Sequence, residues 1–87
     1  MKNDYMTIEH AVEQATDEAW RDWSMEHPSL ARVIDRTRLI DRTADSLRRS
    51  PEFRQAVDAY HRAGSELELL AQLSELAAGV LQKVLGL

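Results

Sequence analysis

The sequence contains no cysteine, three glycines, two prolines and five aromatic residues, namely two tryptophans, two tyrosines and one phenylalanine. Without cysteine the chain forms no disulfide and no cysteine-ligated metal site. The absence of cysteine fits a cytoplasmic protein, and we expect that location. Glycine, proline and β-branched residues are all sparse, so the composition favours helices over strands and turns. We therefore predict an all-α fold.

The chain is also short, with 87 residues, which we expect to form one domain spanning residues 1–87. A chain of this size buries only about 60% of the surface that its unfolded form exposes, so its stability is marginal without further support. Disulfides are excluded, and three scattered histidines do not form a clustered metal-ligand pattern. Association with another chain is the remaining common means of stabilisation, and a homodimer is its simplest form.

The sequence lacks the apolar segments of secreted and membrane proteins. The first ten residues carry acidic side chains and no apolar run, so we expect no signal peptide. The longest apolar stretch near the end, residues 76–81, is interrupted by Gly79. It falls far short of the about 20 residues that a membrane-spanning helix needs. No membrane partner is predicted.

Motifs for catalysis and metal binding are missing as well. There is no glycine-rich phosphate loop and no nucleophile elbow. His10 and Glu13 form an H-x-x-E pair on a predicted helix, but di-iron bundles use the reverse order, E-x-x-H. His10 is predicted to face solvent, His27 to lie at a helix end, and His61 to be exposed. We expect no enzymatic activity, no cofactor and no metal.

Positive charge is scarce overall but concentrated in one segment. The net charge of the whole chain is −4. Residues 1–28 hold two basic and seven acidic residues, a net charge of −5. Residues 29–50 hold six arginines and three aspartates, which is +3, and residues 51–87 carry −2. The simplest interpretation places the acidic first segment beside the basic second one. Alternatively, the acids form a working face for the basic surface of another protein. The arginines scatter around their helix without interleaved aromatic residues, so no nucleic-acid partner is predicted.

The first helix is predicted over residues 7–26, with Thr7 as its cap. Its apolar residues recur with a helical period of about 3.6 residues and include three alanines, which let a neighbouring helix approach closely. They are Ile8, Ala11, Val12, Ala15, Ala19 and Trp23. Trp20 lies at the edge of this stripe, so we expect both tryptophans to pack in the core at one end of a bundle.

The second helix is predicted over residues 29–49, because the residue before Pro28 resists the helical conformation and ends the first helix. Two residues break its apolar pattern. Asp41 falls within the stripe and Leu39 on the opposite side, so we expect Asp41 to meet an arginine across a helix interface and Leu39 to face outward. Alternatively, both are exposed at the margin. The stripe consists of Leu30, Val33, Ile34, Thr37, Ile40, Ala44 and Leu47.

The third helix is predicted over residues 51–63, after the clearest local signal in the chain. Ser50 is a helix cap, Pro51 suits the first helical position, and Glu52 suits the first turn. The next two residues, Gly64 and Ser65, allow two interpretations. Either glycine ends this helix and serine opens the next in a capping box with Glu68, or one helix runs through glycine at a cost of about 1 kcal/mol. We favour the break.

The last helix, predicted over residues 66–85, is the most unusual segment. Eight of the eleven leucines lie within residues 65–87. Its polar residues form one narrow line, and both flanks of that line are apolar, as in a helix that is buried on two sides at once. The polar line consists of Glu68, Gln72, Glu75, Gly79, Gln82 and Gly86. The opposite seam, with coiled-coil spacing, consists of Leu70, Leu73, Ala77, Val80, Val84 and Leu87.

This apolar surface indicates a partner. Leaving four or five leucine or valine side chains exposed would forgo roughly 1.5–3 kcal/mol each. Self-association is one explanation, docking into a different protein is a second, and a central position in a monomeric bundle is a third. A membrane surface fits poorly, because the polar line carries two glutamates and surface helices carry lysine and arginine there. The predicted interface consists of Leu69, Leu70, Leu73, Leu76, Val80, Leu81, Val84 and Leu85.

The sequence therefore predicts a small antiparallel bundle of three to four helices with a leucine-rich C-terminal helix. Its predicted function is that of a non-enzymatic protein–protein interaction module, which self-associates through that helix as a homodimer. The alternative is a small acidic regulatory or adaptor protein, which binds a different protein through its first or its last helix.

Overall fold

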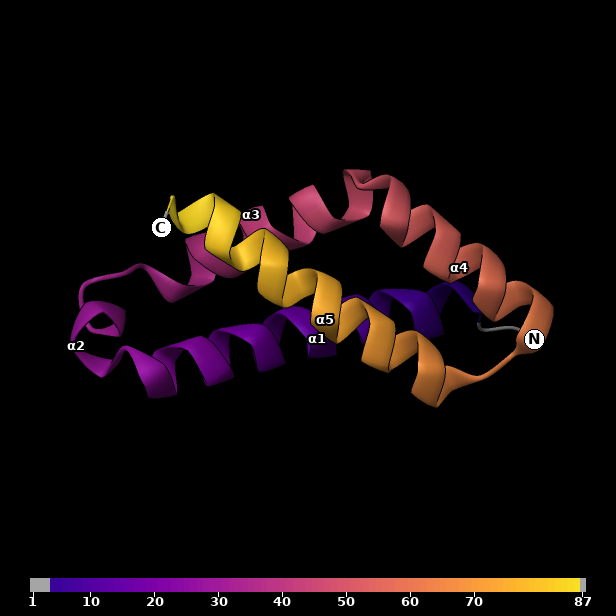
Figure 1. The fold of residues 1–87 in the computed structure, drawn as a ribbon, viewed down its shortest axis with the longest axis horizontal. Helices are drawn as coiled ribbons and strands as arrows, with labels where there is room; N and C mark the ends of the chain where they lie inside the picture. Colours follow the sequence, from indigo (N-terminus) through magenta and orange to yellow (C-terminus); the bar gives the residue numbers. More distant parts are fainter. Residues whose placement is uncertain (1–3, 87) are drawn as a thin grey trace.

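The structure, a computed structural model, describes residues 4–86, and it describes side chains for residues 8–62 and 64–86. Within this part of the chain there are five helices and no strand, which confirms the all-α prediction (Figure 1). The predicted cap Thr7 and the last seam residue, Leu87, lie outside the described side chains. The helices are α1 (Asp4–Glu26), α2 (Pro28–Ala31), α3 (Arg36–Arg49), α4 (Pro51–Ala63) and α5 (Glu66–Leu85).

Helix α5 joins the other long helices together. It packs against α1, α3 and α4, and its contact with α1 is the most extensive in the molecule. In Figure 1, α5 crosses in front of α1, while α3 and α4 follow each other along one long edge. The result is an elongated body of 42 × 22 × 19 Å. The first and last long helices are therefore the main packing partners, although they lie at opposite ends of the sequence.

The core is built where α1, α3 and α5 meet. Small residues dominate the α1 side of it, where the buried Ala11, Ala15 and Ala19 allow α5 to approach closely. Two threonines are buried in the core, and their hydroxyls donate hydrogen bonds to carbonyls of their own helices. Thr16 Oγ1 lies 3.0 Å from Val12 O, and Thr43 Oγ1 lies 2.8 Å from Leu39 O. These bonds remove the cost of burying the two hydroxyl groups.

The two tryptophans pack in this core, as predicted. Trp20 and Trp23 are both buried, and their rings stack with centroids 5.8 Å apart. The His27 ring lies 4.7 Å from the Trp23 ring, at the point where α1 ends. The first helix begins at Asp4, three residues before the predicted start at residue 7.

The predicted second helix, residues 29–49, is wrong as one continuous element. The chain forms the short α2, leaves the helical conformation, and begins α3 at Arg36. The physical reason is a local cap: Asp35 Oδ1 accepts a hydrogen bond from the Arg38 N–H at 3.3 Å, which starts a new helix. Val33, predicted in the apolar stripe, lies in the connection and is 80% exposed.

The predicted orientation of α3 is wrong in part, although Ala44 and Leu47 of the predicted stripe are buried as expected. Leu39, expected to face outward, is only 6% exposed and lies in the core, whereas Asp41 and Thr37 are exposed. The predicted stripe depended on Leu30 and Val33, which belong to the segment before the helix break. Once α3 begins at Arg36, its buried side is set by its own residues, Leu39, Thr43, Ala44 and Leu47.

The break between α4 and α5 is confirmed. Gly64 adopts a left-handed conformation with φ 73°, and its N–H donates to Tyr60 O. This conformation strains residues with a side chain, so glycine is well suited to end α4. Ser65 Oγ then accepts a hydrogen bond from the Glu68 N–H at 3.2 Å and opens α5. The Ser50 cap on the Phe53 N–H, also 3.2 Å, is confirmed as well.

Candidate protein-interaction surface

The eight residues of the predicted interface fall into two groups. Leu69, Leu73 and Leu81 are fully buried within the chain's own core. The other five are partly exposed, and they are Leu70, Leu76, Val80, Val84 and Leu85. The three buried leucines are unavailable to a partner while the chain keeps this fold. The prediction is therefore narrowed to the partly exposed residues.

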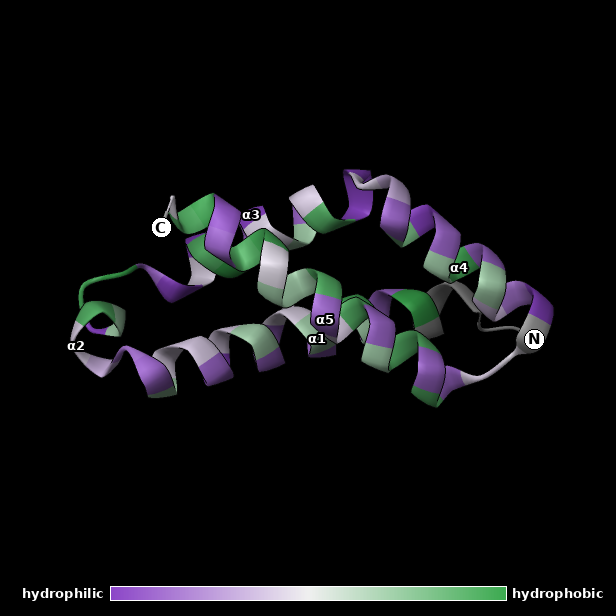
Figure 2. Ribbon diagram, in the orientation of Figure 1, coloured by the Kyte–Doolittle hydropathy of each residue, from purple (hydrophilic) through white to green (hydrophobic). Residues whose placement is uncertain are grey.

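The polar line of α5 lies on the surface along its whole length. All six of its members are exposed: Glu68, Gln72, Glu75, Gly79, Gln82 and Gly86. Figure 2 shows that hydrophobic residues also recur along the full length of α5. One flank of the polar line is covered by α4, since Gln72, Glu75 and Leu76 line a shallow groove against that helix.

The other flank of the polar line is only partly covered by the chain. Its apolar and small side chains are accessible from Leu67 to Ala78, whereas Leu81 on the same flank is buried and Leu85 packs partly against the core. Leu67 is 83% exposed, Ala71 and Ala78 are exposed, and Ser74 and Leu85 are partly exposed. Successive spacings of four, three, four and seven residues place them on one face of α5. We call these five residues the outer strip.

The predicted interface left out four members of the outer strip, namely Leu67, Ala71, Ser74 and Ala78. Their signal was present, because they lie on one of the two apolar flanks of the polar line. The choice between the flanks depends on which side the rest of the chain covers, and this is a property of the tertiary structure.

The molecule exposes more surface than a compact monomer of its mass. The accessible surface is 6159 Å², whereas a compact chain of 10.0 kDa exposes about 5,200 Å². Its radius of gyration is 13.2 Å, compared with about 12 Å for a typical domain of this length. The excess of about 900 Å² belongs to the whole molecule and fits its elongated shape.

Ion pairs connect α1 to α3 on a different face of the molecule from the outer strip. Arg36 lies 2.8 Å from Asp17, and Arg48 lies 3.0 Å from Glu9, so two arginines of α3 pair with acids of α1. This confirms that the acidic first segment lies beside the basic second one. These side chains are mostly exposed, so each pair contributes at most about 1 kcal/mol.

A groove of about 760 Å³ lies between α1 and α3, and it contains His10 and Glu13. Both arginines that line it, Arg36 and Arg48, are already paired with carboxylates. Glu13 and Asp41 also line the groove and form no ion pair with any residue whose side chain is described. Among the described residues, no group of three or more histidine or carboxylate side chains is arranged to hold a metal.

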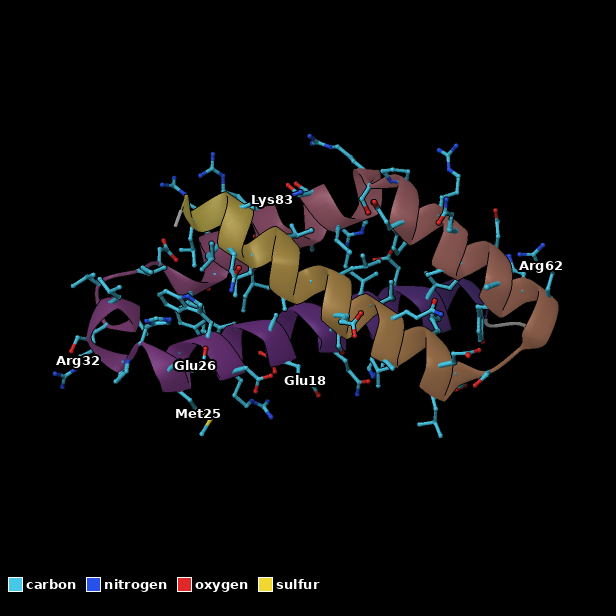
Figure 3. The ribbon with its side chains drawn as sticks, viewed as in Figure 1. Glu18, Met25, Glu26, Arg32, Arg62 and Lys83 are labelled. Carbon is cyan, nitrogen blue, oxygen red and sulfur yellow. The ribbon has the colours of Figure 1, made fainter. Side chains whose placement is uncertain are left out.

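A second exposed apolar cluster lies at the end of the molecule that carries α2. Met25 is 76% exposed and points away from the bundle (Figure 3), and Leu30 and Val33 are exposed nearby in the sequence. These three residues come from the last turn of α1, from α2 and from the connection to α3, so they do not share one helical face as the outer strip does.

Comparison with known proteins leaves the function to be argued from the structure. No protein-family model matches the chain, and no match was found among curated proteins or solved structures. Within the described residues, none of the helices is both long enough and apolar enough to span a membrane.

Proposed function

We propose that this protein is a non-enzymatic protein–protein interaction module that self-associates as a homodimer through α5. In this proposal the helices form an antiparallel bundle, with the inner side of α5 in its core. The outer strip on α5 carries the proposal, because it is an apolar helix face that the chain's own fold covers only in part. A second copy supplies the same apolar face and is present wherever the protein is present.

The exposed apolar side chain of Leu67 supports the proposal energetically. Leu67 alone would contribute roughly 1.5–3 kcal/mol on full burial, and a symmetric dimer buries it twice. The partly exposed Leu70 adds further apolar surface near it, and Leu85 does so at the other end of α5.

Sedimentation equilibrium, from low micromolar to near-millimolar concentration, tests the proposal. We expect the mass to rise from the monomer value of 10.0 kDa toward twice that value. The variant Leu67→Ser should remain monomeric at concentrations where the natural chain is dimeric. A matched control is Leu30→Ser, since Leu30 is also exposed but lies on α2. A natural chain that stays monomeric throughout would overturn the proposal.

The groove between α1 and α3 favours a second candidate function, that of an acidic adaptor for a basic segment of another protein. Its carboxylates Glu13 and Asp41 have no ion-pair partner among the described side chains, and the chain carries a net charge of −4. A lysine-rich synthetic helix is the test probe, with a glutamate-rich helix as control. The adaptor function requires binding of the lysine-rich helix alone, weakening with salt and with Glu13→Gln. Equal or absent binding of the two peptides would exclude it.

A further inference from the structure

We infer that α5 of one copy packs antiparallel on α5 of a second copy, outer strip against outer strip, around a two-fold axis near residue 76. This inference rests on the proposed self-association and adds its orientation and register. The partner of the outer strip is the same strip of an identical chain.

The order of side-chain sizes along the strip supports this register. Leucines lie at its two ends, Leu67 and Leu85, and the small residues Ala71, Ser74 and Ala78 lie between them. When the strip is rotated about position 76, Leu67 faces Leu85 of the second copy, Ser74 faces Ala78, and Ala71 faces position 81, where Leu81 is buried in the core of its own chain. Each large side chain then meets another large one at the ends. The small residues in the middle allow the two helices to approach at the short end of the usual 8–10 Å range.

Charge distinguishes the antiparallel arrangement from a parallel one. The first turn of α5 carries Glu66 and Glu68, and its last turn carries Lys83. A parallel pair would bring four carboxylates together at one end. The antiparallel pair separates them and places each acidic first turn near the last turn of the other copy, which also aligns the helix dipoles favourably. Figure 3 shows Lys83 near the C-terminal end of α5.

The same geometry predicts how salt affects the dimer. Glu75 is exposed on the polar line close to position 76, so the two-fold axis brings the two copies of Glu75 to the same side of the pair. Each copy also has a net charge of −4. Because added salt screens this repulsion, the dimer should tighten as ionic strength rises, which is opposite to the capture of a basic peptide.

Disulfide cross-linking tests the register, and the absence of natural cysteine makes an introduced thiol unique. The variants Ser74→Cys and Ala78→Cys are prepared with tags of different mass, mixed, and oxidised mildly. We expect the mixed Ser74→Cys–Ala78→Cys product to exceed half of all cross-linked chains, because only this pairing brings the Cα atoms within the about 4.4–6.8 Å that a disulfide requires. The control is Arg49→Cys, an exposed position on α3, which should cross-link weakly.

Each other outcome has a definite meaning. If products of two identical variants dominate, the helices pair in parallel, which overturns the orientation and leaves self-association intact. If sedimentation shows a dimer but neither variant cross-links more than Arg49→Cys, the outer strip is not the interface. If the uncross-linked chains are monomeric at every concentration, the proposed function fails together with this inference. Circular dichroism of each variant confirms that it is folded before the comparison.

Discussion

The two faces of α5 are both rich in apolar residues, yet they have different roles. The inner face is buried against α1, α3 and α4 and includes Leu69, Leu73, Ala77 and Leu81. The outer strip carries Leu67, Ala71, Ser74, Ala78 and Leu85 and is only partly covered by the chain. Leucine content alone therefore does not mark a binding surface. The inner face holds the monomer together, whereas the outer strip stays accessible along much of α5.

The largest effect on the stability of the monomer is expected from breaking the inner face. Leu73 is completely buried, so Leu73→Ala should lower the free energy of unfolding by about 2–5 kcal/mol through lost burial and a cavity. Urea denaturation followed by circular dichroism measures the change. The loss should be seen even in dilute solution, where the chain is monomeric. A loss that appears only at high concentration would place Leu73 at the intermolecular interface instead.

Breaking the outer strip should act on association and leave the monomer intact. We expect Leu67→Ser to raise the dimer dissociation constant about 10²–10⁴-fold, since two leucines are lost per dimer at roughly 1.5–3 kcal/mol each and each tenfold change corresponds to about 1.4 kcal/mol. Its unfolding in dilute solution should match that of the natural chain. Sedimentation and urea denaturation at one low and one high concentration separate the two effects. Equal destabilisation at both concentrations would show that Leu67 acts within the monomer.

The start of α5 determines how both of its faces are presented. Replacing the cap in Ser65→Ala removes the hydrogen bond accepted from the Glu68 N–H, at a cost of about 0.5–2 kcal/mol. Thermal unfolding measures it, and Ser65→Asp, which keeps a capping oxygen, is the matched control. If alanine and aspartate have the same effect, the cap does not contribute to stability.

The smallest effect is expected away from both faces, at the ion pair of α1 with α3. Arg36→Gln removes the 2.8 Å contact with Asp17 and should cost less than about 1 kcal/mol, because both side chains are largely exposed. It should leave the dimer dissociation constant unchanged. Thermal unfolding at low and high salt gives the comparison. A shift in the dimer constant would show that this face also takes part in association.

The helix boundaries that the sequence predicted correctly depend on local signals. Ser50 with Pro51 and Gly64 with Ser65 act within a few residues, so their effect does not require knowledge of the rest of the fold. α4 and α5 accordingly begin and end at the predicted residues, 51–63 and 66–85.

The predictions failed where a periodic pattern hid a local signal. They also failed where tertiary contacts determine which side of a helix is buried. The regular spacing of Leu30, Val33 and Ile34 suggested a continuous helix and concealed the cap at Asp35, which in turn misplaced Leu39. The covered side of α5 follows from its packing with α1. Periodicity within α5 could show two apolar flanks but could not show which one the distant α1 would cover.

The packing of α1 against α5 also has a consequence for biosynthesis. Because the chain is made from its N-terminus, the alanine-rich side of α1 is synthesised before α5, the helix that packs against it. Until α5 has emerged from the ribosome, Trp20 and Trp23 have no complete core to enter. The core is therefore expected to form only after α5 has been synthesised.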